Sequence, residues 1–93
     1  MLPLMHRMPT IRFEYYTRAR DKTGISHERV TLPADVCVKS AIEWVRAKYS
    51  SLVPLIDHRS VLLAVNDTMT DFADATALKE GDTVAFVPPV SGG

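Results

Sequence analysis

The residues best suited to chemistry stand at the end of the chain, where an apolar, strand-like run leads through two prolines to a Gly-Gly carboxylate. A proline fixes its own φ and biases the residue before it toward extended conformations, so Pro88 and Pro89 predict a stiff spacer. Glycine has no Cβ and lets a backbone thread a narrow channel. The predicted tail consists of Pro88, Pro89, Val90, Ser91, Gly92 and Gly93.

The reactive group of such a tail is the α-carboxylate of Gly93. With an unperturbed pKa of about 3.5, it is ionised at neutral pH and inert until it is activated. A Gly-Gly end by itself is more often a frayed terminus or a cloning remnant. The two prolines and the strand pattern before them favour a tail that enters the active site of another protein.

Length, charge and cysteine count exclude several classes of protein. A chain of 93 residues forms one small domain and leaves no room for a two-domain enzyme with its own cofactor cleft. Eleven basic and eleven acidic residues give no positive field for nucleic acid. The single cysteine, Cys37, permits neither an intrachain disulfide nor a paired-cysteine metal site, which fits a reducing, cytoplasmic setting.

No apolar run approaches the length of a membrane span, so we expect no membrane association. Residues 1–9 lack the long apolar stretch of a signal peptide and are expected to form a disordered leader. The folded domain is therefore expected to begin at residue 10.

Alternation of apolar and polar residues predicts the first two strands. Ile11, Phe13 and Tyr15 share one face of the first strand, and residues 26–32 alternate in the same way. Residues 17–24 are polar and charged and end in a glycine, which is typical of a connection that turns at Gly24. The two strands should form a hairpin with a long loop.

A segment with helical periodicity follows the second predicted strand. Asp35 is placed to cap the helix at its amino end. The expected core face consists of Val38, Ala41, Ile42, Val45 and Tyr49. Ser50-Ser51 and Pro54 should end the helix and begin an irregular stretch up to Ser60. Three residues of that stretch should pack against the core, namely Leu52, Leu55 and Ile56.

The last third of the chain returns to strands. A continuous apolar run at 61–65 predicts a buried strand, residues 68–70 a short one, and residues 83–87 the strand that leads into the tail. We expect one helical turn over Ala75–Leu78 and a turn at Gly81-Asp82. The order of elements predicts an α+β domain in which one main helix packs on a mixed sheet of four or five strands.

Several of these features together resemble a known family. They are residues 11–16, Arg20, Gly24, Leu63-Ala64-Val65-Asn66, Gly81-Asp82 and, most specifically, the end from Phe86 to Gly93. Over residues 10–93 the chain is similar to the MoaD-type sulfur carriers of the MoaD/ThiS family, which are small subunits of molybdopterin synthase. The resemblance implies a ubiquitin-like β-grasp fold over residues 10–87 and an active tail over residues 88–93.

The family's activity implies a role for each partner. An E1-like adenylyltransferase uses ATP to convert the carboxylate of Gly93 to an acyl-adenylate, which is then sulfurated to a thiocarboxylate. The tail inserts into the large synthase subunit and donates its sulfur to cyclic pyranopterin monophosphate, which builds the dithiolene of molybdopterin. Catalytic side chains are expected on the large subunit, and this chain is expected to bind no cofactor or metal itself.

Apolar residues on the outer faces of the strands suggest where partners bind. Tyr16, Ala85 and Val87 face away from the expected core, and neighbouring strands would gather them beside the tail. Sheets also expose scattered apolar side chains that have no such role. Arg20, on the polar connection, could orient acidic groups of a partner.

Other functions remain open. The chain could be a ubiquitin-like modifier conjugated through Gly93, a sulfur carrier for another pathway, or an interaction domain with an inert terminus. Cys37 could act as a nucleophile near the start of a helix, where thiol pKa values fall, although a small, partly buried packing residue is the stronger interpretation.

Overall fold

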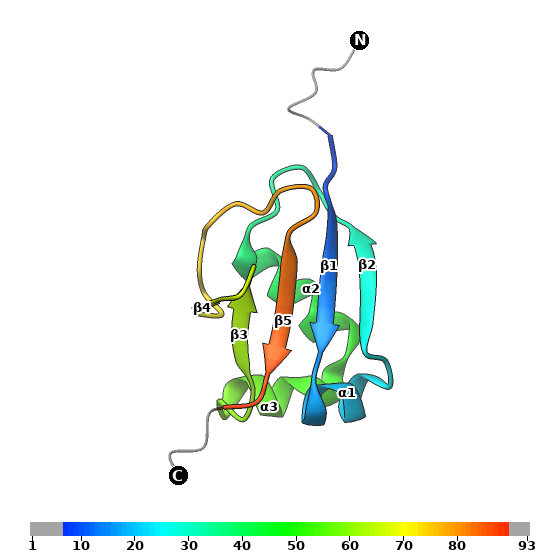
Figure 1. Ribbon diagram of the computed structural model, residues 1–93, viewed down its shortest axis with the longest axis vertical. Coiled ribbons are helices and arrows are strands. Elements are labelled where there is room, and N and C mark those ends of the chain that lie inside the picture. Colours follow the sequence, from blue (N-terminus) through cyan, green and yellow to red (C-terminus); the bar gives the residue numbers. More distant parts are fainter. Residues whose placement is uncertain (1–6, 90–93) are drawn as a thin grey trace.

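The computed structural model describes residues 7–89. A five-stranded sheet lies across them, with its helices gathered on one face (Figure 1). The strands are β1 (Thr10–Tyr15), β2 (His27–Thr31), β3 (Leu62–Val65), β4 (Thr68–Thr70) and β5 (Thr83–Val87). The helices are α1 (Thr17–Thr23), α2 (Val38–Lys48), the 3-10 helix η2 (Ser50–Leu52) and α3 (Val53–Asp57). The predicted α+β class, with α2 as the main helix, is confirmed.

The last strand is the centre of the sheet, whose order is β2-β1-β5-β3-β4. It runs parallel to β1 and antiparallel to β3, while β1·β2 and β3·β4 are antiparallel pairs. The β3·β4 hairpin turns at Asn66 and Asp67, both with positive φ, as a tight turn of this kind requires. Asn66 Oδ1 also accepts the N–H of Thr83 at 2.9 Å, which attaches the hairpin to the start of β5.

The hydrophobic core lies between the sheet and the helices. Ile11, Phe13 and Tyr15 of β1 are at most 1% exposed, which confirms the predicted core face. Tyr15 stacks on Phe86 of β5 with ring centroids 5.5 Å apart. Four of the five residues predicted for the core face of α2 are buried, as are the three packing residues after it: Val38, Ala41, Ile42, Val45, Leu52, Leu55 and Ile56. The fifth, Tyr49, follows the helix as its C-cap and is only partly buried against the core.

A carboxylate joins β2 to the end of α2. Glu28 Oε2 accepts hydrogen bonds from the hydroxyls of Tyr15 at 2.8 Å and Tyr49 at 2.7 Å. Its Oε1 accepts from Lys48 Nζ at 2.8 Å, and this ammonium also lies 5.1 Å from the ring centroid of Trp44. Burial alone would raise the pKa of Glu28, but the hydrogen bonds from Lys48, Tyr49 and Tyr15 outweigh it and hold the pKa below its ordinary value.

Because the pKa of Glu28 is lowered by folding, its ionised form stabilises the domain at neutral pH. That stabilisation is present above the unfolded-state pKa of about 4.3 and is lost as pH falls through the lower folded value. Urea unfolding of the wild type and of Glu28→Gln should therefore differ most near pH 7, and the difference should shrink below about pH 4. A difference that stays constant down to pH 3 would contradict this account.

The prediction of a loop at 17–24 is wrong, because the segment forms helix α1. Only Ala19 of the helix is buried, so α1 carries no apolar periodicity that a sequence could reveal. The turn expected at Gly24 is confirmed. Gly24 has φ 81°, and its N–H donates to the carbonyl of Arg20, which closes the helix.

Three further local predictions are wrong. Asp35 does not cap α2, since the helix begins at Val38 and Cys37 is its N-cap residue. Pro54 does not end the helical region, because a proline is tolerated in the first turn of α3, where its missing N–H has no intrahelical acceptor. Residues 75–78 form no helical turn. Ala77 instead forms an antiparallel bridge with Cys37.

Candidate functional site

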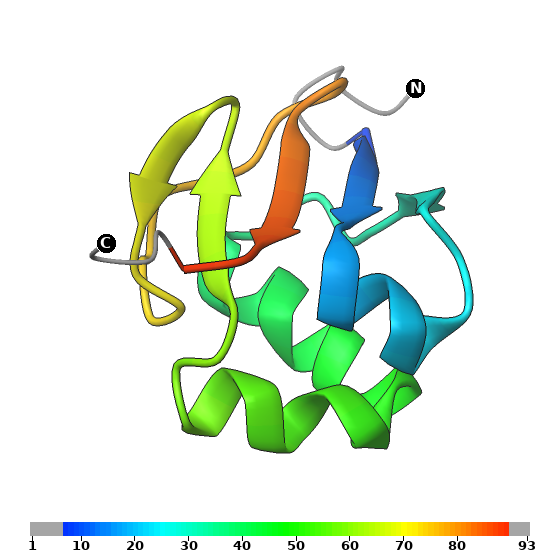
Figure 2. The ribbon, with the colours of Figure 1, turned by 60° about the horizontal axis from the view of Figure 1, so that its bottom comes forward.

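The root of the tail is held on both sides by the sheet. Val87, the last residue of β5, is paired with Leu62 of β3, and the N–H of Tyr16 donates to the carbonyl of Phe86 at 3.1 Å. Pro88 and Pro89 are exposed. In both ribbon views the segment after β5 passes over the side of β3 where that strand begins (Figures 1 and 2). The sheet therefore sets the position and direction in which the chain leaves the domain.

The rest of the predicted tail lies outside the described residues. These positions are Val90, Ser91, Gly92 and Gly93. The described part of the site is thus the spacer of two prolines, its root in β5 and the sheet face beside it.

The face of the sheet opposite the helices has an apolar half next to that root. Strands β1 and β5 are paired so that Glu14 lies opposite Ala85. The N–H of Tyr16, directly after β1, donates to the carbonyl of Phe86, so Tyr16 lies at the end of β5 near Ala85 and Val87. Tyr16 is 46% exposed, whereas Ala85 is only 7% exposed because its neighbours cover it.

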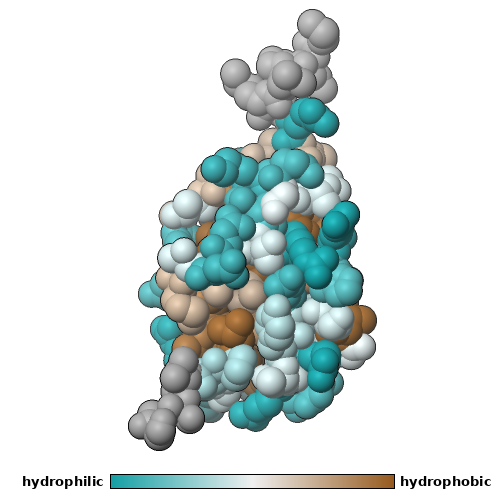
Figure 3. Space-filling view, in the orientation of Figure 1, coloured by the Kyte–Doolittle hydropathy of each residue, from teal (hydrophilic) through white to brown (hydrophobic). Residues whose placement is uncertain are grey.

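Neighbouring strands extend this surface. Alternation along β3 and β4 places three more apolar side chains on the same face. Together with the two from β5 they form a set of five, which we call the apolar strip: Leu62, Ala64, Met69, Ala85 and Val87. In Figure 3, which looks onto this face, the brown and tan surface lies in its lower half, beside the root of the tail. Leu62 and Ala64 could not be assigned to this face from the sequence, because the run at 61–65 is apolar throughout and shows no alternation.

The other half of the open face is charged. Arg12 Nε donates to Glu14 Oε2 at 2.8 Å, and the hydroxyl of Tyr16 donates to Glu14 Oε1 at 2.9 Å. The pKa of Glu14 is lowered because both groups donate to its carboxylate, and the hydrogen bond from Arg12 has the larger effect. This chain of contacts runs along β1 from the charged half to the root of the tail. Sequence alone could not show it, because it depends on side-chain rotamers.

The other residues singled out from the sequence lie apart from the open face. Arg20 is exposed on α1, at the end of the sheet where β5 delivers the tail (Figure 1). Cys37 is half-buried, and its bridge to Ala77 places it near the segment that leads into β5, far along the chain from the tail. Hydrogen bonds from the backbone N–H and the hydroxyl of Ser40 lower the pKa of its thiol.

The part of the chain that the structure describes, residues 7–89, contains neither a metal site nor a membrane-spanning helix. No group of three or more His, Cys, Asp or Glu side chains in that range could hold a metal ion. No helix there is long and apolar enough to cross a membrane.

Known proteins resemble this chain along most of its length. A model described as the ThiS family matches residues 13–93. The molybdopterin synthase sulfur carrier subunit of Drosophila yakuba is 29% identical over 80 residues, which cover 85% of this chain and 86% of that protein.

Solved structures share the fold. A putative molybdopterin converting factor subunit 1 from Pyrococcus furiosus superposes with a TM-score of 0.76 at 25% identity, covering 88% of this chain and 99% of its own. SAMP1 of Haloferax volcanii gives 0.74 at 21% identity, with coverages of 90% and 99%. The complex of subunits 1 and 2 of the molybdopterin-converting factor of Helicobacter pylori gives 0.63 at 18% identity, with coverages of 90% and 99%.

These superpositions confirm the predicted ubiquitin-like β-grasp fold. The family model begins within β1 and continues through the sheet and the tail to the last residue, Gly93. The chain therefore belongs to the ThiS family.

Proposed function

We propose that this chain is the sulfur carrier subunit of a molybdopterin synthase. The observation that carries the proposal is the family match that runs without a break through the Gly-Gly end, in a chain whose similar curated protein bears that function in its name. The fold supports it, since β5 is fixed at the centre of the sheet and a pair of exposed prolines follows it.

The chemistry takes place at the carboxylate of Gly93. One of its oxygens attacks the α-phosphorus of ATP on an E1-like adenylyltransferase, and pyrophosphate leaves. A sulfur nucleophile then displaces AMP from the acyl-adenylate, and the chain is released with a terminal thiocarboxylate. The soft sulfur of that group is the atom donated to cyclic pyranopterin monophosphate. No side chain of this protein needs to act as an acid or base.

The open face supplies the surface for the large synthase subunit. The apolar strip lies beside the root of the tail, so a partner that covers it also receives the tail (Figure 3). The complex of subunits 1 and 2 from Helicobacter pylori supports a two-subunit assembly. Threading of the tail would hold its last atom at the reacting centre and so convert a bimolecular step into an intramolecular one.

Intact-mass spectrometry tests the proposal. The chain is expressed with its adenylating partner, ATP and a sulfur source, and we expect a mass gain that corresponds to one oxygen replaced by sulfur. The product should then transfer that sulfur to the pterin precursor when the large subunit is added. An unchanged mass in the presence of a competent partner would rule out the function.

A second candidate is a ubiquitin-like protein modifier. The observation that favours it is the structural likeness to SAMP1, whose family is named for small archaeal modifier proteins. In that case Gly93 would form isopeptide bonds, and the same expression experiment would yield adducts linked to lysines of other proteins. A carrier for another pathway would gain sulfur but would not convert the pterin precursor.

A further inference from the structure

Two arginines occupy opposite positions of paired strands on the open side of the sheet. Arg12 of β1 and Arg29 of β2 are paired residues in the antiparallel register, so their side chains emerge on the same face. Like charges directly opposite one another destabilise a pair of strands. The free domain would therefore gain stability if one of them were replaced by an acidic residue.

Neighbouring side chains neutralise this pair only in part. Glu14 accepts the Nε–H of Arg12, which fixes the plane of that guanidinium and leaves its terminal N–H groups directed elsewhere. Arg29 forms no salt bridge with any carboxylate among residues 7–89. Terminal N–H groups of both arginines therefore remain available as donors, and those of Arg12 are already oriented by Glu14.

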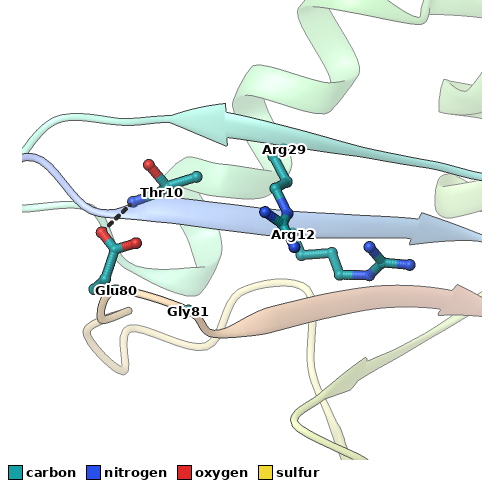
Figure 4. Close-up of a pocket in the computed structure, with 5 residues that line it drawn as sticks. All are labelled: Thr10, Arg12, Arg29, Glu80 and Gly81. Carbon is teal, nitrogen blue, oxygen red and sulfur yellow. Dashed lines mark hydrogen bonds between the residues drawn. The ribbon is translucent and has the colours of Figure 1, made fainter.

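The arginines line a shallow hollow. Its volume is about 230 Å³, and it is lined by Thr10, Arg12, Arg29, Glu80 and Gly81. Figure 4 shows the side chain of Arg29 reaching from β2 over β1 and that of Arg12 extending along β1, with the carboxylate of Glu80 turned to the backbone of Thr10. Glu80 Oε1 accepts the N–H of Thr10 at 2.9 Å and so is held at the rim of the hollow.

The size and position of the hollow argue for a protein side chain as its occupant. Small-molecule sites usually enclose about 300–1,000 Å³, which is more than this hollow offers. It also lies on the same face as the apolar strip, so one partner surface could cover both. A guanidinium matches the geometry of a carboxylate, because two of its N–H groups can donate to both oxygens, and a second arginine at the paired position adds positive charge.

We propose that the guanidinium of Arg29 is a fork that binds a carboxylate, from an aspartate or glutamate of the protein that covers the open face, and that the positive charge of Arg12 at the paired position strengthens this binding. Glu14 is a positioning residue that orients Arg12. The bound carboxylate would offset the repulsion between the arginines, so the complex recovers a stability that the free chain lacks. The inference rests on the proposed function, which makes the large synthase subunit that protein.

Charge reversal at Arg29 tests the fork. Arg29→Glu should weaken binding to the purified large subunit by about tenfold or more, measured by calorimetry, and should reduce the dependence of the affinity on salt. The same variant should raise the melting temperature of the free chain by about 2–5 °C, because a cross-strand ion pair replaces a repulsion. A residue with only a structural role would not shift the two quantities in opposite directions.

Lys39→Glu is the matched control. It makes the same change in net charge at an exposed position on α2, on the other side of the sheet, and should leave the affinity within about twofold of the wild type. Equal losses in Lys39→Glu and Arg29→Glu would overturn the fork, as would an unchanged affinity in Arg29→Glu.

Titration with inorganic phosphate, followed by NMR of the arginine side chains, tests a small-anion site instead. We expect no saturation below millimolar concentration, and saturation in the micromolar range would overturn the proposal.

If the wild type binds the large subunit and accepts sulfur but the arginine variants behave like it, only the fork fails. If the wild type does neither, the proposed function fails, and the fork loses its partner.

Discussion

Deletion of Gly93 will abolish sulfur acceptance and leave the domain folded. The truncated chain ends in a carboxylate displaced by one residue, about 3.5 Å, from the position that the adenylating site requires. A misplacement of about 1 Å can already cost 10²-fold in rate. Among residues 7–89 the last member of the buried core is Phe86, so the melting temperature should change by less than about 2 °C. Intact mass after expression with the adenylating partner measures the first effect, and circular dichroism measures the second.

Extension by one glycine is the matched control for that deletion. It keeps the chemistry of the terminus and displaces the carboxylate by a similar distance in the opposite direction, so it should also lose sulfur acceptance. Retention of activity in either variant would show that the position of the last atom is not critical. Unfolding of the truncated chain would show that the tail is part of the folded structure.

Replacement of Glu28 by alanine will be among the most destabilising changes that a polar residue of this domain can undergo. The carboxylate accepts three hydrogen bonds, from Tyr15, Lys48 and Tyr49. Tyr15 is 1% exposed, so its hydroxyl would be left buried without an acceptor. We expect the free energy of unfolding to fall by about 2–4 kcal/mol, measured by urea denaturation at pH 7.

Glu14→Ala provides the comparison for Glu28→Ala. Glu14 likewise accepts hydrogen bonds from a cationic and a tyrosine side chain, Arg12 and Tyr16, but on the solvent-exposed face. Water can replace it there, and we expect a loss below about 1 kcal/mol. If the two variants lost the same stability, or if Glu28→Ala were within about 0.5 kcal/mol of the wild type, the cluster around Glu28 would not hold β2 to α2.

Elements with a buried apolar face could be predicted from the sequence. The alternation in β1, the helical spacing in α2 and the short strands β3 to β5 all reflect which side chains the core removes from water. Helix α1 could not be predicted in this way, because it buries only Ala19. Helix α3 was hidden by Pro54, which is compatible with a first turn but usually indicates a break.

The candidate site also contains features that a sequence shows directly and features that depend on how the strands pair. The proposed reactive terminus rests on residue types that a sequence displays directly, and the placement of Tyr16 near the end of β5 follows once β1 and β5 are assumed to be neighbours. The pairing of Arg12 with Arg29 could not be anticipated, because it depends on the register of a hairpin whose connection contains a helix. A shift of one residue would place the two side chains on opposite faces.

The central position of β5 also determines how the domain bears a mechanical load. A partner that grips the tail loads the domain at Val87, and the component of the pull along β5 acts across the hydrogen bonds of this strand to β1 and β3. Such a pull loads both ladders in shear, so their bonds must fail together, whereas an edge strand pulled sideways would peel away one bond at a time. If the chain acts as the proposed carrier, its tail can be drawn into and out of successive active sites without the domain coming apart at β5.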